Sequence, residues 1–128
     1  LDIIVPYNSI VFCPLAGSVH KLGKETQKGN YGGYLILKHK IKNQTFYSLY
    51  GHLKTPHKIK LGQQILAGQE LARIGKETDS GGWFCHLHLQ IITQKAMNEG
   101  YSEWGYISEK LVSKVEEYFP NPNSLFKW

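Results

Sequence analysis

The sequence predicts a mainly β fold, built of antiparallel sheets with one helix near the C-terminus. Through the first two-thirds of the chain, short runs of β-branched and aromatic residues alternate with clusters of Gly, Pro and Asn. This pattern is typical of strands joined by tight turns. Helical spacing of apolar residues is clear in one segment only, after residue 107.

The first half of the chain predicts a series of short strands. They are Ile3–Val5, Ile10–Cys13, Ser18–Leu22, Tyr34–Lys40 and Thr45–Tyr50. The run Tyr34–Leu37 is apolar without alternation, so this strand is expected to be covered on both faces.

The next segment repeats a Gly-Gln turn between apolar residues, at Gly62-Gln63 and at Gly68-Gln69. Short strands that double back sharply suit this pattern, with each Gly at a positive φ. A further strand is expected over Phe84–Ile92, and the one predicted helix spans Ser108–Phe119. Ser108 is a suitable N-cap and Pro120 ends the helix. Its apolar residues are Leu111, Val112, Val115 and Phe119.

The length of 128 residues fits a single domain, residues 1–128. The chain is 41% hydrophobic and 20% charged, as globular proteins are. Its apolar runs fall well short of the ~18–20 residues of a membrane span, so membrane insertion is not expected. Because the chain begins at Leu1 and not at Met, we expect an excised or processed piece that lacks a short N-terminal segment. A full-length chain then has room for additional domains.

A net charge of +5 and a pI near 9.2 favour anionic partners. The lysines are spread thinly, however, and no basic run is interleaved with aromatic residues, so nucleic acid is not an expected partner. Cys13 and Cys85 are the only cysteines. They could form one disulfide or remain thiols, so they leave the compartment open.

The strand around residue 88 carries the sharpest chemical signal. Alternation along a strand places His86, His88 and Gln90 on one face and Leu87 and Leu89 on the other. Two neighbouring imidazoles suit a metal ligand beside a proton-transfer group. An isolated pair of this kind is more often found on the surface of an edge strand.

Two further residues are candidates by position. His52 lies in Tyr50-Gly51-His52-Leu53, where a Gly lets the backbone turn beside a cleft, and Asp2 directly precedes an apolar strand. Taken singly, each is more typical of an exposed strand end than of a site. Their order along the chain, together with the His86–Gln90 strand, is more informative.

That order resembles the lysostaphin/LytM-like zinc metalloendopeptidases along nearly the whole chain. Their pattern runs from H-x-x-x-D through a strand ending in an exposed His, a Y-x-H-L segment and paired G-Q turns to an H-L-H strand. The matching segments here are Leu1–Pro6, Ser9–Val19, Leu35–His39, Tyr50–Leu53, Ile59–Gly75 and His86–Ile91.

The resemblance implies a groove in a LytM-like β fold of the duplicated hybrid-motif type. It also implies Zn²⁺ held by Asp2 and His88, with His52 and His86 as unliganded catalytic histidines. The third ligand, the His of H-x-x-x-D, would precede Leu1, and we favour a trimmed chain over a degenerate site. His20, His39 and His57 match family positions outside the metal shell, or none.

The family implies hydrolysis of peptide cross-links in bacterial cell wall, or of a related Gly-containing peptide. The bulky Trp83 departs from the family's small polar loop and is expected to reshape one wall of the cleft. That loop and the Pro120–Asn123 tail look like a branch joined to aminotransferase-like and kinase-like domains. In that branch the location would be cytoplasmic and not the cell envelope.

Two other readings remain open. A catalytically inactive peptidoglycan-binding or regulatory module of the same fold would explain the incomplete ligand set. A phosphohistidine carrier of the sugar-permease type also places two histidines on neighbouring strands. Such a carrier needs one reactive His and no acidic ligand, whereas this chain has His86, His88 and Asp2.

Overall fold

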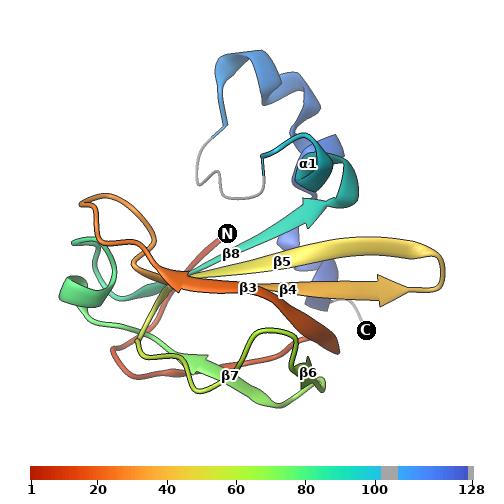
Figure 1. The fold of residues 1–128 in the computed structure, drawn as a ribbon. Coiled ribbons are helices and arrows are strands. Elements are labelled where there is room, and N and C mark those ends of the chain that lie inside the picture. Colours follow the sequence, from red (N-terminus) through yellow and green to blue (C-terminus); the bar gives the residue numbers. More distant parts are fainter. Residues whose placement is uncertain (102–106, 127–128) are drawn as a thin grey trace.

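The computed structural model describes residues 1–101 and 107–126, and it is built around one large antiparallel sheet (Figure 1). Its strands follow the spatial order β1-β8-β5-β4-β3-β6, and every neighbouring pair is antiparallel. The strands are β1 (Asp2–Ile4), β8 (His86–Thr93), β5 (Gln44–Leu53), β4 (Gly33–Ile41), β3 (Gly17–Lys24) and β6 (Gln64–Ile65). The predicted fold class is confirmed.

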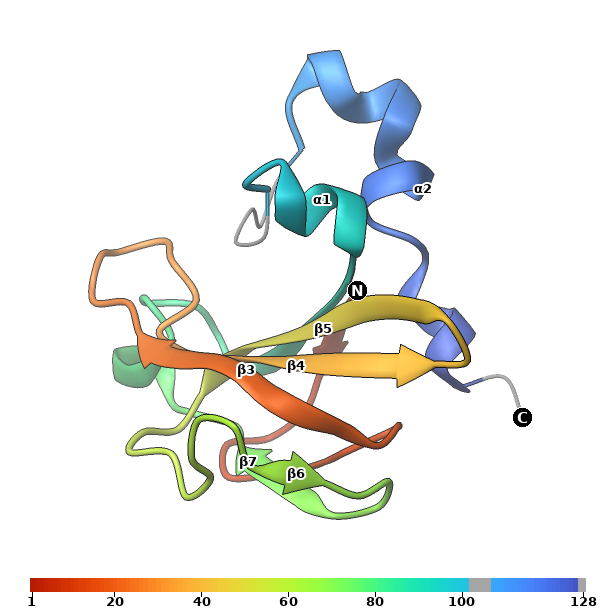
Figure 2. The same ribbon diagram turned by 45° about the vertical axis from the view of Figure 1, so that its right-hand side comes forward.

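A small second sheet pairs β2 (Ile10–Phe12) with β7 (Glu70–Arg73) and lies against one face of the large sheet (Figure 2). Aliphatic side chains from both sheets fill the space between them, including Val11, Leu35 and Leu71. On the opposite face, Ile36, Leu49 and Ile92 pack beneath the C-terminal helices. Strand β4 is therefore covered on both faces, as its unbroken apolar run predicted.

The helical segment predicted at Ser108–Phe119 is confirmed, although much of it is a 3₁₀ helix. A 3₁₀ helix spans Glu109–Lys114, and a single α-helical turn, α2 (Val115–Tyr118), follows. Tyr118 is the buried side chain of this turn, while Val112 and Val115 are exposed. The predicted apolar stripe is thus wrong in detail. The tighter 3₁₀ winding changes the side-chain spacing at Val112, and Val115 is exposed within the α-helical turn.

Other short helices were not predicted from the sequence. They are α1 (Gln94–Asn98) and the 3₁₀ helices Glu77–Asp79 and Pro122–Phe126. The hydroxyl of Thr93 caps α1 by accepting a hydrogen bond from the backbone N–H of Ala96 at 3.1 Å. Among the residues that the structure describes, no helix is long and apolar enough to cross a membrane.

The resemblance implied an exposed histidine at the end of β4, and this expectation is wrong for His39. Its side chain is fully buried, and its ring nitrogens bond to the Ala16 carbonyl at 2.9 Å and to the Ser48 hydroxyl at 2.7 Å. Two polar partners inside the protein make that burial tolerable. Cys13 and Cys85 are both free thiols.

Candidate active site

Neighbouring strands β1, β8 and β5 bring the candidate residues together. Asp2 lies opposite His88 across the β1–β8 ladder, and Gly51 lies opposite His88 across the β5–β8 ladder. His52 follows Gly51 directly, and His86 stands two residues before His88 on the same face of β8. The four residues singled out from the sequence therefore share one place on the sheet.

These side chains line a cavity of about 440 Å³. One wall is aromatic and belongs to the loop before β8, where Trp83 and Phe84 are partly exposed. The expectation that Trp83 shapes the cleft agrees with this position. The full lining is Asp2, Glu25, Gly29, Asn30, Tyr31, His52, Trp83, Phe84, His86 and His88.

Asp2 and His88 are in direct contact, with Oδ1 of the carboxylate 2.9 Å from Nδ1 of the imidazole. On its other side, Nε2 of His88 lies 3.1 Å from Oε1 of Gln90. A neutral imidazole has only one N–H, so one of these contacts sets a lone pair against an oxygen unless the ring is protonated. Asp2 and Nδ1 of His88 are the groups that would hold a cation here, and Gln90 would then keep the proton on Nε2.

This donor set fits Zn²⁺ in kind, because carboxylate oxygen and imidazole nitrogen are both zinc ligands. It does not complete a site. Among residues 1–101 and 107–126, no group of three or more His, Cys, Asp or Glu side chains is placed to hold a metal. Catalytic zinc sites take three protein ligands, so a further ligand is needed beside Asp2 and His88.

His52 and His86 have their tautomers set by backbone carbonyls. Nδ1 of His52 lies 3.2 Å from the Ser80 oxygen, and Nδ1 of His86 lies 2.7 Å from the Phe84 oxygen. A carbonyl can only accept, so each Nδ1 is the donor and each Nε2 is the basic nitrogen. Both rings are buried, and their centroids are 4.1 Å apart.

The pKa of His52 is lowered to about 4, mainly by burial and then by the neighbouring His86, against a hydrogen bond to Ser80 that raises it. His52 is therefore neutral at neutral pH and available to accept a proton. Its backbone has a φ of +63°, a conformation that is uncommon for a residue with a side chain. Such a conformation persists where the surroundings impose it, as functional sites often do.

The loop that contains Asn30 and Gly32 interlocks with the loop that contains Asp79 and Gly81, and this contact fixes the position of the Ser80 carbonyl beside His52. A side-chain carbon at Gly32 would collide with the backbone of Asp79, and one at Gly81 would collide with the backbone of Asn30. Ser80 is fully buried, and its hydroxyl donates to the Trp83 oxygen at 2.8 Å. The same loop therefore supports both the histidine and the aromatic wall.

Tyr31 and Glu25 were not predicted as site residues, because a tyrosine and a glutamate in a polar loop carry no distinctive sequence signal. The ring of Tyr31 lies 5.1 Å from that of His88 and 5.9 Å from that of His52. Its hydroxyl is buried and has no hydrogen-bond partner among the residues that the structure describes, and burial raises its pKa. Gly51 permits this contact, since a side-chain carbon there would press on the Tyr31 ring.

The remaining histidines lie outside the cavity, as expected. His20 packs against Tyr47 with ring centroids 4.9 Å apart, His39 is buried in the sheet, and His57 bonds the Gly23 oxygen at 2.9 Å. None of them lines the cavity that holds His52, His86 and His88.

Several solved structures share this fold. The catalytic domain of lysostaphin from Staphylococcus simulans matches with a TM-score of 0.60 at 21% identity, over 72% of this chain and 64% of that one. LytU matches with a TM-score of 0.58 at 18% identity, over 96% of this chain and 75% of that one. A putative glycyl-glycine endopeptidase LytM from Ruminococcus gnavus matches with a TM-score of 0.54 at 23% identity, over 80% and 41%.

The chain thus spans less than two thirds of the lysostaphin catalytic-domain structure and under half of the Ruminococcus one. At these identities the likeness establishes the fold. No curated protein matches the sequence. The model of peptidase family M23, however, matches residues 1–99, which hold all four predicted site residues. The chain therefore belongs to peptidase family M23.

Proposed function

We propose that this domain is a zinc-dependent endopeptidase that cleaves peptide cross-links of bacterial cell wall, or a related Gly-containing peptide. The observation that carries the proposal is the placement of two donor side chains, Asp2 and His88, beside two histidines with basic Nε2 atoms in one cavity. Membership of a peptidase family supports it. So does the shared fold with lysostaphin and a putative glycyl-glycine endopeptidase.

Asp2 and His88 would hold the zinc. The third ligand would be a histidine three residues before Leu1, on the chain that leads into β1. When bound, zinc lowers the pKa of water towards ~7 and polarises a carbonyl group. The ladder of β1 with β8 keeps Asp2 and His88 in register for this role.

His52 and His86 would handle protons. Each keeps its Nδ1 proton on a backbone carbonyl, so its Nε2 can accept a proton from the attacking water. Once protonated, that Nε2 becomes a donor and can return the proton to the leaving amine. The other histidine would stabilise the charge that develops on the carbonyl oxygen when its own Nε2 carries a proton, because only then can that nitrogen donate.

The aromatic walls of the cavity fit a narrow peptide. Tyr31, Trp83 and Phe84 all line the cavity, and their bulky rings would favour a backbone that carries little or no side chain. Glycine meets that condition, because its backbone can approach a surface that a Cβ would keep away.

The test is hydrolysis of a Gly-containing peptide by a chain extended upstream by about ten residues, with zinc present. His86→Ala is expected to reduce turnover by at least ~10²-fold, the usual contribution of a general acid or base. His20→Ala is the matched control, because His20 lies outside the cavity. Unchanged turnover in His86→Ala would show that His86 takes no part in the mechanism. If neither the extended chain nor its variants hydrolyse the peptide, the proposed endopeptidase activity is wrong.

An inactive binding module is the second candidate. In its favour, the described residues contain only two of the three ligands that a catalytic zinc site needs. Saturable, zinc-free binding of soluble muropeptides by the extended chain, without cleavage, would establish this module in place of the enzyme.

A further inference from the structure

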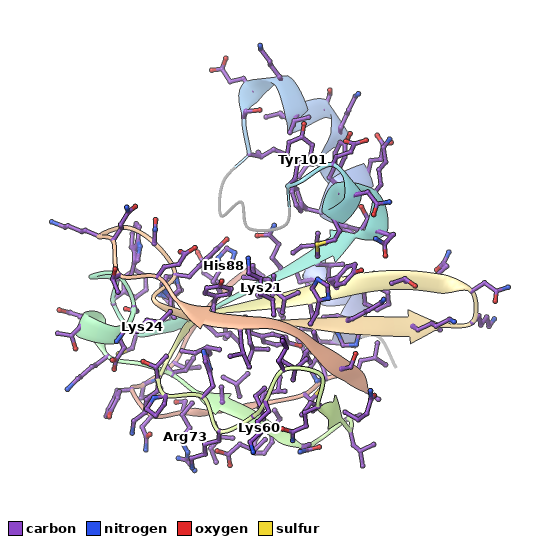
Figure 3. All side chains as sticks on the ribbon, viewed as in Figure 1. Lys21, Lys24, Lys60, Arg73, His88 and Tyr101 are labelled. Atoms are coloured by element: carbon purple, nitrogen blue, oxygen red, sulfur yellow. The ribbon has the colours of Figure 1, made fainter. Side chains whose placement is uncertain are left out.

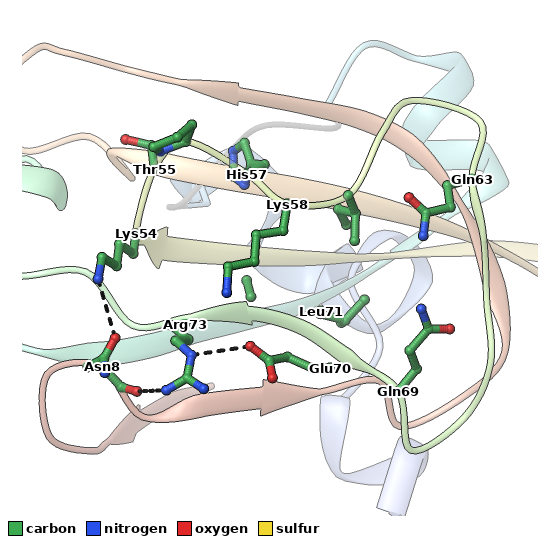
Figure 4. A pocket seen from close by; sticks show the side chains of 13 residues that line it. Asn8, Lys54, Thr55, His57, Lys58, Gln63, Gln69, Glu70, Leu71 and Arg73 are labelled. Carbon is green, nitrogen blue, oxygen red and sulfur yellow. Dashed lines mark hydrogen bonds and ion pairs between the residues drawn. The ribbon is translucent and has the colours of Figure 1, made fainter.

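A second cavity, of about 550 Å³, lies between β7 and the loop that follows β5 (Figure 4). Figure 3 places Arg73, in its wall, on the other side of the large sheet from His88. The two cavities share no lining residue. We call the second one the basic cavity, because its wall carries the cations Lys54, Lys58 and Arg73 against a single carboxylate, Glu70.

Glu70 does not neutralise this charge. Its Oε1 is paired with Nε of Arg73 at 3.2 Å, and Nη1 of Arg73 donates to the Asn8 carbonyl at 3.3 Å. These bonds fix the guanidinium but use only part of its five N–H groups. Lys54 makes one long hydrogen bond of 3.5 Å to the Asn8 side chain and lies 5.5 Å from the centre of the Tyr7 ring, and neither contact neutralises its charge.

The two Gly-Gln turns add neutral donors to the same wall. Oε1 of Gln63 accepts from the Lys60 N–H at 3.0 Å, and Oε1 of Gln69 accepts from the Leu66 N–H at 3.1 Å. In each turn, a backbone N–H therefore bonds to the amide oxygen of the glutamine. The NH₂ groups of both amides, which can only donate, are left to bond a ligand in the cavity (Figure 4).

His57 adds a buried acceptor that lacks a hydrogen-bond partner in the described part of the chain. Its Nε2 lies 2.9 Å from the Gly23 carbonyl and must donate to it, so Nδ1 carries a lone pair. That Nδ1 is buried and has no hydrogen-bond partner among residues 1–101 and 107–126. His57 lines the basic cavity, so a small turn of its ring would bring this shielded nitrogen within reach of a donor in the cavity.

We propose that the basic cavity is a binding site for an anionic, hydroxyl-bearing ligand, namely a phosphorylated or carboxylated sugar. Lysine, arginine and amide donors match the acceptor oxygens of the phosphate or carboxylate, and a sugar hydroxyl can donate to His57. Such a site would hold the domain on a surface rich in these sugars. It requires neither zinc nor peptide cleavage, so it stands apart from the proposed enzyme.

The test is a titration of the whole chain with glucose 6-phosphate, glucuronate, inorganic phosphate and glucose, followed by amide NMR. Saturable shifts confined to Asn8 and residues 54–73 are expected with one or both sugar anions and none with glucose. The two anions distinguish phosphate from carboxylate. Replacing both Lys54 and Lys58 by Gln is expected to weaken binding about tenfold, equivalent to about 1.4 kcal/mol.

Replacement of Lys40 and Lys110 by Gln is the matched control. It removes the same charge from exposed lysines outside the cavity, and binding should not change. An equal loss in this control, or no saturable shift with either sugar anion, would overturn the site. Equal affinity for inorganic phosphate and glucose 6-phosphate would overturn the role given to the sugar hydroxyl.

Discussion

The carboxylate of Asp2 lies 2.9 Å from Nδ1 of His88, although 86 positions separate the two residues in the sequence. Their contact depends on the β1–β8 ladder, in which each pairs with the other across the strands. Side chains opposite each other on paired strands hold a fixed separation. The two proposed zinc ligands are therefore placed by sheet register and not by a flexible loop.

This placement predicts that His88 is needed for zinc binding, whereas His86 is needed for turnover alone. In the chain extended upstream by about ten residues, His88→Ala should lower zinc affinity by at least ~10²-fold, because a zinc ligand is lost. His86→Ala should leave about one zinc per chain, as its Nδ1 is already bonded to the Phe84 carbonyl. Elemental mass spectrometry after dialysis measures both. Equal zinc loss in the two variants would show that the roles of the two histidines are not distinct.

The ring of Phe84 stacks on His86, with centroids 4.7 Å apart, and His52 lies on that imidazole at 4.1 Å. His86 is thus held by Phe84 through both the ring and the backbone carbonyl. Phe84→Ala removes only the ring, so kcat should fall about tenfold while zinc content is unchanged. Phe84→Leu keeps an apolar contact and should recover part of the loss. If KM rises while kcat is constant, Phe84 contacts substrate and does not orient His86.

The interlocked loops predict that alanine substitution destabilises the protein much more at one glycine than at another, although both have a positive φ. Gly32 has a φ of +65° and Gly62 a φ of +80°, but a side-chain carbon at Gly32 would strike the Asp79 backbone, whereas nothing lies within 4 Å at Gly62. Gly62→Ala should cost about 1 kcal/mol of unfolding free energy, from the positive φ alone. Gly32→Ala should cost at least about 3 kcal/mol, since backbone must move. Similar urea midpoints for the two variants would contradict the interlock.

Much of the fold followed from the sequence because its signals are local. The unbroken apolar run at Tyr34–Leu37 predicted a strand covered on both faces, and packing on both sides of β4 confirms it. The Gly-Gln turns likewise predicted glycines at positive φ, which Gly62 and Gly68 adopt. Alternation placed His86 and His88 on one face of a strand, and both line the cavity.

What could not be predicted depends on contacts between distant segments. The burial of His39 is set by Ala16 and Ser48, and the position of Tyr31 is set by the absence of a side chain at Gly51. Val112 followed α-helical spacing in the sequence, but it lies in a 3₁₀ helix, where the spacing of side chains differs. The roles of Asp2, His52, His86 and His88 remain predictions.

The buried His39 predicts how stability responds to pH. Its Nδ1 donates to the Ala16 carbonyl, so Nε2 accepts from Ser48, and Ser48 in turn bonds the Tyr50 hydroxyl at 3.1 Å. Burial lowers the pKa of His39, although the bond to Ala16 opposes the shift. The unfolded chain, with a histidine pKa near ~6.5, then binds the proton more readily than the folded protein. Stability is full above that pH and falls as the pH drops through the lowered folded pKa.

His39→Gln should therefore flatten the dependence of unfolding free energy on pH, by up to ~1.4 kcal/mol per pH unit below pH ~6.5. Burial also lowers the pKa of His20 and His52, so the informative quantity is the difference in slope between the variant and the parent chain. Urea unfolding with a chelator present, at pH values from about 5 to 7.5, gives that difference free of any metal effect. The variant should be less stable than the parent at neutral pH, because Ser48 loses its acceptor, and this deficit should shrink as the pH falls. Parallel curves would mean that His39 takes up a proton equally in both states, and that the buried chain from Ala16 to Tyr50 does not hold it neutral.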